Sequence, residues 1–381
     1  MKKFALLTLA GIMASAAPSF AETFSVLIAN TAVTALSGNA SPIVDDVAVD
    51  ATGRIIFADR ATSTNENIVR FDNNGTNGVL VKTVADIITA VELVNGTSTQ
   101  SAVSIRGIDV AADGDIIVLS DGSGAQTGLL LSIDPTTFAV TVLCCSKDAA
   151  VSTVEGSGVL KVIGNTAYIG YEGSFGGPAG DAVVAVDTND TVNLPNIPST
   201  IIAGPAALEA VVTGLLGPGS LNLGPITSTP SGDLIVADSN GSGTTDDLIL
   251  IDLPSGTPSL LVDNTDTIAD FSAGAVTDLG YGGLAVVPSG TVYGADNFGS
   301  PNTDTGRGIA KLESPGAGIA TGTLLTNGQF KTDTGGTTTP SLGRAVYDSF
   351  SSRVLFANSS GDRQGIIAMS LGSGVSSWDL Y

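Results

Sequence analysis

Hydrophobic and polar positions form one pattern that returns six times along the chain. Each copy has an apolar strand, a small polar turn built around Gly, Asn or Ser, a second apolar strand, and then usually Asp or Asn. The copies are VAVDATGRIIFAD (47–59), IDVAADGDIIVLSD (108–121), LKVIGNTAYIGY (160–171), ITSTPSGDLIVAD (226–238), LAVVPSGTVYGAD (284–296) and AVYDSFSSRVLFAN (345–358). A repeat of this kind determines an architecture more firmly than any single residue does.

More strand signal follows each copy. Third strands are NIVRFD (67–72), GLLLSID (128–134), AVVAVD (182–187), DLILID (247–252), GIAKLE (308–313) and GIIAMSL (365–371). Fourth strands are GVLVKTV (78–84), AVTVLCC (139–145), STIIA (199–203), PSLLV (258–262) and TGTLLT (321–326). Four antiparallel strands at a period of about 50 to 65 residues are typical of propeller blades. The pattern therefore predicts an all-β, six-bladed β-propeller with four-stranded antiparallel blades.

The sixth blade lacks a fourth strand of its own. Phe24–Ala29 is the natural donor, since this strand otherwise has no partner, and Val375–Tyr381 is the competing donor. Apolar residues recur at helical spacing in Asp86–Leu93 and Ala206–Leu216, so we expect helical connections that cap one face of the ring. No linker interrupts the pattern, which predicts a single domain over residues 22–381.

The first 21 residues have the features of a secretory signal peptide. Lys2 and Lys3 precede an apolar run over residues 4–17, and Ser19-Phe20-Ala21 is a small-x-small cleavage site before Glu22. The alternative is a membrane anchor, but the run is shorter than the roughly 20 apolar residues that span a bilayer. No Cys lies near the cut, so no lipobox is present. We expect a secreted or periplasmic protein with no membrane insertion.

Charge and residue usage limit the chemistry. The chain has 15 basic and 37 acidic residues, a net charge of −22, so nucleic acid is not expected as a partner. Cations would be attracted, although the acidity also serves simple solubility outside the cell. There is no histidine, which excludes Ser-His-Asp catalysis and any His-ligated metal. We also expect no haem and no nucleotide. Oxygen ligands around Ca²⁺ or Mg²⁺ remain possible, with Tyr or Lys as acid or base.

Cys144 and Cys145 are the only cysteines and are adjacent. They are too close in sequence to cross-link distant parts of the chain. A strained vicinal disulfide, free thiols and a pairing between chains all stay open.

Pro42–Asp72, PIVDDVAVDATGRIIFADRATSTNENIVRFD, resembles an NHL-type repeat. The pattern is also similar to the calcium-dependent superfamily of regucalcin-like gluconolactonases, phosphotriesterases and strictosidine-synthase-like proteins. The resemblance implies a six-bladed propeller. In the lactonase branch, it further implies a divalent metal held in the central channel by Glu, Asn and Asp side chains just before the first strands.

Matching those positions in this sequence suggests a calcium site. Asp45, Glu155 and Asn222 precede the first strands of the first, third and fourth repeats. Hard oxygen ligands suit Ca²⁺, and a rigid ring can supply them from different blades. The alternative is that these three residues are solvated loop ends.

Four further residues stand at equivalent positions and are candidates for ligand binding: Asp46, Arg106, Tyr281 and Arg344. Arg106 and Arg344 together could clamp an anion, or they could neutralise Asp45 and Asp46 in structural ion pairs across the channel. Tyr281, between two glycines, is either a general base or a packing residue. Calcium in turns that begin with Asp72, Asp238 or Asp263 is a weaker hypothesis, since Asx turns explain them without a metal.

The absence of a recognisable catalytic set favours a non-catalytic binding or scaffold protein. Its partner would be a protein, a glycan or a small molecule that binds through one face of the ring. One alternative is a Ca²⁺-dependent hydrolase of lactones or esters, in which the metal polarises the carbonyl and activates water. A second alternative is an extracellular matrix or surface-layer component, suggested by the acidic surface rich in Thr, Gly and Ser.

Overall fold

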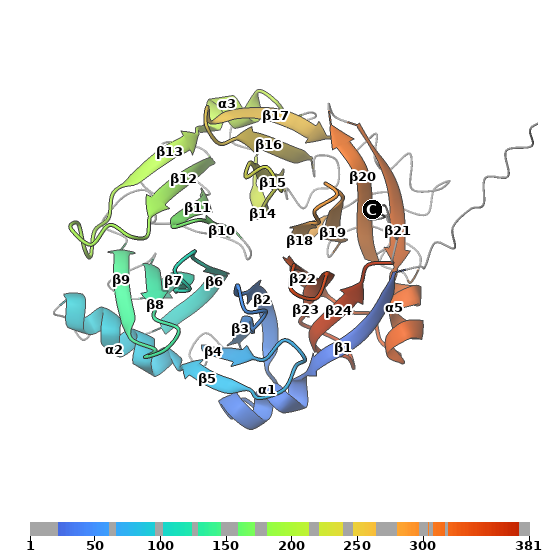
Figure 1. Ribbon diagram of the computed structural model, residues 1–381, viewed down its shortest axis with the longest axis horizontal. Helices are drawn as coiled ribbons and strands as arrows, with labels where there is room; N and C mark the ends of the chain where they lie inside the picture. Colours follow the sequence, from blue (N-terminus) through green and yellow to red (C-terminus); the bar gives the residue numbers. More distant parts are fainter. Residues whose placement is uncertain are drawn as a thin grey trace, which may run out of the picture.

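Six four-stranded antiparallel sheets form a closed ring in the computed structural model of this chain (Figure 1). The structure describes residues 22–60, 66–95, 102–123, 129–145, 159–171, 181–212, 221–238, 247–263, 280–296, 304, 308–316 and 319–372. The predicted six-bladed propeller is therefore confirmed.

Each blade runs from an inner first strand to an outer fourth strand. Blades 1 and 2 contain β2 (Ile43–Val49), β3 (Ile55–Arg60), β4 (Glu66–Phe71), β5 (Val79–Lys82), β6 (Ala102–Val110), β7 (Ile116–Ser123), β8 (Leu129–Ile133) and β9 (Val140–Cys145). Blades 3 and 4 contain β10 (Leu160–Ile163), β11 (Thr166–Tyr171), β12 (Ala182–Asp187), β13 (Ser199–Ala203), β14 (Leu223–Ser228), β15 (Leu234–Asp238), β16 (Leu248–Asp252) and β17 (Thr257–Val262). Blades 5 and 6 contain β18 (Tyr281–Val286), β19 (Val292–Asp296), β20 (Gly308–Gly316), β21 (Ile319–Thr326), β22 (Leu342–Asp348), β23 (Arg353–Asn358), β24 (Gly365–Ser370) and β1 (Thr23–Ala29).

The N-terminal strand closes the ring, as predicted. β1 pairs antiparallel with β24, from Thr23 opposite Ser370 to Ala29 opposite Gly365. The Phe24 side chain is buried, and its ring centroid lies 5.7 Å from that of Phe330. The competing donor at the C-terminus lies outside the described residues.

Tight turns between the first and second strands explain why glycine recurs in the repeat. Gly53, Gly114, Gly232 and Gly290 all have φ between 83° and 98°, in the left-handed region that glycine adopts without steric cost. In blade 6 the residue just before the second strand is Ser352, which has φ of 51°. The polar turn of the pattern is thus a backbone requirement rather than a chemical motif.

Buried apolar side chains of the described residues form six clusters, each shared by two neighbouring blades. One cluster joins blades 1 and 2, for example, and includes Ile56 and Ile68 from one side with Ile108 and Val118 from the other. Because each sheet is covered on both faces, its strands can be nearly continuous apolar runs. The ring is therefore the smallest unit that buries every blade.

Four helices in the described part of the chain, each after a fourth strand, lie at the outer edge of the ring (Figure 1). They are α1 (Asn30–Ser37), α2 (Val84–Asn95), α3 (Pro205–Glu209) and α5 (Asn327–Thr334). The sequence predicted α2 and α3 but missed α1 and α5. The expected capping of one face is wrong for these helices, because they fill the gaps between blades at the rim. None of the helices in the described ranges is both long and apolar enough to cross a membrane.

The cysteine pair ends the outer strand of blade 2. Cys144 is fully buried in the cluster between blades 2 and 3. The side chain of Cys145 lies outside the described residues, so the alternatives of a vicinal disulfide, free thiols and a pairing between chains all stay open.

Candidate functional site

The two ends of the ring differ in their connections. We call the end where first strands begin the upper end, and the end with the tight glycine turns the lower end. Connections from second to third strands and from fourth to first strands all join at the upper end. The six first strands β2, β6, β10, β14, β18 and β22 surround the axis (Figure 1).

Arg344 on β22 reaches across this axis. Its Nη2 donates to the carbonyl of Leu160 on β10, at 2.6 Å, and its Nε lies 3.3 Å from Oδ1 of Asp46 on β2. The Arg344 side chain is only 5% exposed. The guanidinium thus connects blades 6, 3 and 1 in the middle of the ring. Of the two alternatives for Arg344, the structure contains the ion pair with Asp46. A role of either residue in ligand binding stays a prediction.

Asp46 is held by several donors. Its Oδ2 accepts from the backbone N–H of Ile108 on the neighbouring blade at 2.7 Å, and its Oδ1 accepts from Val47 N–H at 2.8 Å. Burial raises the pKa of Asp46 to about 6, while Arg344 and these two N–H groups act in the opposite direction. The carboxyl therefore ties blade 1 to blades 2 and 6.

The predicted calcium ligands are only partly within the described structure. Asn222 is half-buried just before β14, and its backbone N–H donates to Oδ1 of Asp238 at 3.1 Å. Glu155 lies outside the described residues, and so does the side chain of Asp45 on β2. Within the described ranges, no group of three or more His, Cys, Asp or Glu side chains is placed to hold a metal ion. The calcium site stays a prediction.

Arg106 and Tyr281 lie on different blades. Arg106 is half-buried on β6, and Tyr281 begins β18 and is 1% exposed. Gly294 lies directly against the Tyr281 ring, since a Cβ there would stand 2.6 Å from two of its carbons. The packing role of Tyr281 is thus visible, and a catalytic role stays a prediction.

Sequence reasoning missed two buried carboxyl groups at the upper end. Burial raises the pKa of Glu66, the first residue of β4, to about 7, although Ile105 N–H and the Ser104 hydroxyl donate to it. Burial also raises the pKa of Asp238, the last residue of β15, to about 7, and the charges of Asp247 and Asp181 add to this effect. Oδ2 of Asp238 has no hydrogen-bond partner among the described residues.

The signal for Asp238 was present in the repeat. The repeated phrase ends in Asp or Asn in five of the six copies, at Asp59, Asp121, Asp238, Asp296 and Asn358. The interpretation of Asp238 as part of a surface turn is wrong, because its side chain is fully buried. In these repeats the recurring polar residue lies near the point where the second strand reaches the upper end of the ring.

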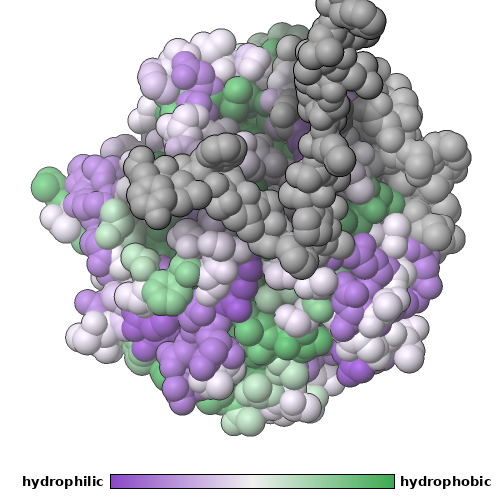
Figure 2. Space-filling model, turned by 45° about the vertical axis from the view of Figure 1, so that its right-hand side comes forward, coloured by the Kyte–Doolittle hydropathy of each residue, from purple (hydrophilic) through white to green (hydrophobic). Residues whose placement is uncertain are grey.

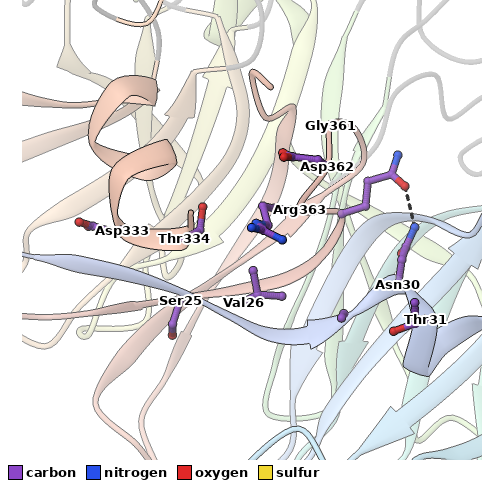
Figure 3. Close-up of a pocket in the computed structure, with 11 residues that line it drawn as sticks. Ser25, Val26, Asn30, Thr31, Asp333, Thr334, Gly361, Asp362 and Arg363 are labelled. Carbon is purple, nitrogen blue, oxygen red and sulfur yellow. Dashed lines mark hydrogen bonds between the residues drawn. The ribbon is translucent and has the colours of Figure 1, made fainter. Parts of the chain in front are cut away.

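A cavity of about 630 Å³ lies at the upper end of blade 6. β1 and the start of α1 form one wall, the end of α5 another, and residues 361–364 between β23 and β24 a third (Figure 3). Arg363 lies between these walls in Figure 3, and its Nη2 donates to the Gly335 carbonyl at 2.6 Å. Asn30 donates to Gln364 Oε1 at 2.7 Å and to the Pro42 carbonyl at 2.8 Å.

Two polar atoms in the wall of this cavity lack a partner. Oδ1 of Asn30 and Nε of Arg363 are both buried and form no hydrogen bond within the described part of the chain. Arg363 also forms no ion pair with any described carboxylate, although Asp362 is its neighbour. The Asp362 oxygens accept instead from Thr337 and Thr338, and the bond from the Thr337 N–H, with the others, holds the pKa of Asp362 well below its usual range. An unsatisfied donor and an unsatisfied acceptor thus share one hollow.

A second hollow, of about 300 Å³, lies at the lower end of the channel. Lys161 contributes the cation there, and its Nζ is 2.8 Å from Oδ2 of Asp109. Because that charge is already paired, this hollow offers a ligand less than the blade 6 cavity does.

The outer surface is uneven. Figure 2 shows apolar patches standing directly beside strongly polar ones on the visible side of the ring. Large apolar side chains that are exposed include Leu93 at the end of α2, Val192, and Phe350 in the lower turn of blade 6. Such a surface is compatible with binding of partners, whereas a uniformly polar surface would count against it.

Comparison with known proteins supports the fold. No protein-family model matches the chain, and no curated protein matches it either. A solved protein of unknown function from Bacteroides thetaiotaomicron is similar, with 12% identity and a TM-score of 0.51 over 92% of this chain and 76% of that one. A PQQ-bound aldose sugar dehydrogenase from Streptomyces coelicolor gives 13% identity and a TM-score of 0.49, over 93% and 99% of the two chains. YCF48 from Cyanidioschyzon merolae gives 8% and 0.47, over 86% and 85%. The chain is a six-bladed β-propeller that resembles these proteins at the level of the fold alone.

Proposed function

We propose that this chain is an exported propeller that binds a ligand without catalysis, through the upper end of the ring. The observation that carries the proposal is the blade 6 cavity, which opens at that end with an unsatisfied donor and acceptor in its wall. Along the axis, Arg344 and Asp46 bind each other and the backbone, and Nη1 of Arg344 is a buried donor without a partner among the described residues. The cavity therefore offers a ligand both an unsatisfied donor and an unsatisfied acceptor, whereas this axial pair offers an unsatisfied donor alone.

The connections support the same end. The connections from first to second strands, at the lower end, are short, as between β14 ending at Ser228 and β15 starting at Leu234. The connections from fourth to first strands, at the upper end, are longer and differ between blades, as between β17 ending at Val262 and β18 starting at Tyr281. Loops that vary on a rigid scaffold are where binding specificity usually resides.

Cleavage at the predicted site would leave the described fold intact, because Glu22, the first residue after that site, already bonds within the ring. Its carboxylate lies 2.6 Å from Lys311 Nζ, and its carbonyl accepts from Gln329 Nε2 at 2.7 Å. These bonds tie the start of β1 to blade 5 and α5. Sequencing the N-terminus of protein recovered from the medium or periplasm should give Glu22, and recovery of the uncleaved chain in the cytoplasm would contradict export.

Photo-crosslinking from the two ends tests which one binds. A photoreactive phenylalanine analogue replaces Thr31, exposed at the upper end beside the cavity, or Ser231, exposed in a lower turn. Illumination in the native extracellular fraction should give adducts from position 31 and few from position 231. Adducts mainly from position 231 would contradict the choice of end. A bound ligand whose mass changes on incubation with the protein would contradict the non-catalytic role.

A further inference from the structure

We propose that the blade 6 cavity binds a neutral carbohydrate through its hydroxyl groups. This inference rests on the proposed function, because it takes the upper end as the binding end and names the class of ligand. Four steps support it: hydrogen-bonding complementarity, charge, shape and rigidity of the wall.

The first step is the pair of unsatisfied atoms. Oδ1 of Asn30 needs a donor, and Nε of Arg363 needs an acceptor. A hydroxyl group can serve either atom, whereas a carboxylate or phosphate only accepts and an ammonium group only donates. A molecule with several hydroxyls satisfies both at once. The two atoms are covered in this structure, so binding includes a small rotation of the half-buried Arg363 side chain, after which the ligand removes two unmet hydrogen-bonding demands.

The second step is charge. Arg363 is the one cationic residue among the described residues that line the cavity, and Asp333 and Asp362 line it too. Asp333 already accepts from Phe24 N–H at 3.1 Å, and in Figure 3 it points away from Arg363. The lining therefore has no excess of positive charge to offset an anion, and the acidic chain repels anions at longer range. A neutral ligand avoids both penalties.

The third step is shape and surface. The volume of about 630 Å³ lies within the roughly 300–1,000 Å³ of small-molecule sites. Val26 and Ala29 on β1 supply apolar surface, and Ser25, Thr31 and Thr334 supply hydroxyl groups. Carbohydrates present both kinds of surface, C–H faces and a rim of hydroxyls, so one molecule can match both.

The fourth step is rigidity. Both amide hydrogens of Asn30 are engaged, one by Gln364 and one by the Pro42 carbonyl, so the orientation of its Oδ1 is determined. Arg363 is held by one hydrogen bond from Nη2 to the Gly335 carbonyl, which leaves it free to make the small rotation that binding requires. A binding group whose rotamer is already set, as that of Asn30 is, loses little conformational entropy when a ligand arrives.

Sugar titrations with matched variants test the inference. The probes are neutral hexoses, pentoses and their disaccharides, each up to about 10 mM, followed by saturation-transfer NMR and calorimetry. Ser25→Trp fills the cavity from an exposed position on β1, where the hydroxyl has no partner among the described residues. Ser259→Trp is the matched control, because Ser259 is an exposed serine on β17, the fourth strand of another blade.

We expect at least one neutral sugar to bind the wild-type protein saturably and the Ser259→Trp protein equally well. Ser25→Trp should abolish binding, and Arg363→Met should weaken it about tenfold or more. Inorganic phosphate and glucuronate are the anionic probes and should not compete.

Three results would overturn the inference: no saturable binding of any neutral sugar, equal binding by the Ser25→Trp protein, or competition by phosphate. None of these would affect the crosslinking from position 31, which tests the proposed function separately. Conversely, adducts confined to position 231 would contradict both the proposed function and this inference, which rests on it.

Discussion

At the scale of single residues, hydrogen bonding and burial act in opposite directions on the pKa values of the described acidic side chains. Asp362 is exposed and accepts several hydrogen bonds, which lower its pKa. Asp46, Glu66 and Asp238 are buried, and burial raises the pKa of each to about 6 or 7. Since Asp238 leaves one oxygen without a partner in the described structure, its charged form is poorly compensated.

Asp238 should therefore make stability depend on pH. Its folded-state pKa is raised, so its contribution to stability is complete below the ordinary Asp value of 3.8 and is lost as the pH rises through about 7. Asp238→Asn should raise the free energy of unfolding relative to wild type by about 1–3 kcal/mol at pH 8 and by less at pH 5. Urea denaturation at both pH values measures this. Asp134→Asn is the control, because Asp134 has a lowered pKa; an equal gain from that variant would contradict the assignment.

Backbone conformation in the lower turns gives a second residue-scale prediction. Gly232 has φ of 98°, and apart from Gly232 and its two chain neighbours no described residue has an atom within 4 Å of the position that a Cβ would take there. Gly232→Ala should therefore lower the free energy of unfolding by about 1 kcal/mol through the backbone alone. Ser352 has φ of 51°, and Ser352→Gly should raise it by up to about 1 kcal/mol. Thermal unfolding of both variants checks the signs, and a stabilised Gly232→Ala protein would refute the argument.

At the scale of elements, the helices at the rim pack between the outer strands of neighbouring blades. Blades diverge outward from the axis, so the gaps between them are widest at the rim. Val33 of α1, Ile87 and Val91 of α2, and Phe330 of α5 are at most 1% exposed, and each lies in a cluster of neighbouring strands. The helices therefore complete the packing of the outer strands.

This packing role predicts that buried and exposed residues of α2 contribute very differently to the free energy of unfolding. Ile87→Ala should lower the free energy of unfolding by about 2–4 kcal/mol, because it leaves a cavity between blades 1 and 2. Leu93→Ala on the same helix should change it by less than about 0.5 kcal/mol, since Leu93 is 79% exposed. Urea denaturation compares the two. Since alanine is the strongest helix former, helix propensity cannot cause a loss in either variant, and similar losses for both would contradict the packing role of Ile87.

At the scale of the whole molecule, Arg344 connects blades that are far apart in sequence. It bonds a carbonyl 184 residues away and pairs with Asp46 on a third blade. Removing one member of such a buried pair leaves the other without compensation. A substitution at Arg344 should therefore lower the free energy of unfolding of the whole ring, not of one blade alone.

Arg344→Met should lower the free energy of unfolding by about 3–5 kcal/mol at pH 8. The loss should be smaller at pH 5, because Asp46, whose pKa is about 6 with Arg344 present, is then largely protonated. The double variant Asp46→Asn with Arg344→Met should recover much of the loss, and urea denaturation measures each step. A double variant as unstable as the single one would contradict the paired role.

The sequence predicted less about the helices and the cavity than about the strands. In α1 and α5 the sequences NTAVTALS and NGQFKTDT carry Thr, Asn or Gly in place of strong helix formers, so local propensity does not reveal them. Burial of Val33 and Phe330 against neighbouring blades stabilises these helices instead. The cavity could not be predicted, because its walls come from three segments that only ring closure brings together.

The sequence by itself determined the number of blades, the order of their strands and the closing strand. These features depend on local physics: short apolar runs separated by polar turns, glycine at left-handed turns and an N-terminal strand without another partner. Only the tertiary structure decided which charges meet at the axis, which acids lose their solvent and where a hollow with unmet hydrogen bonds remains. Those properties depend on distances across the ring between residues far apart in the chain, and no local pattern encodes such distances.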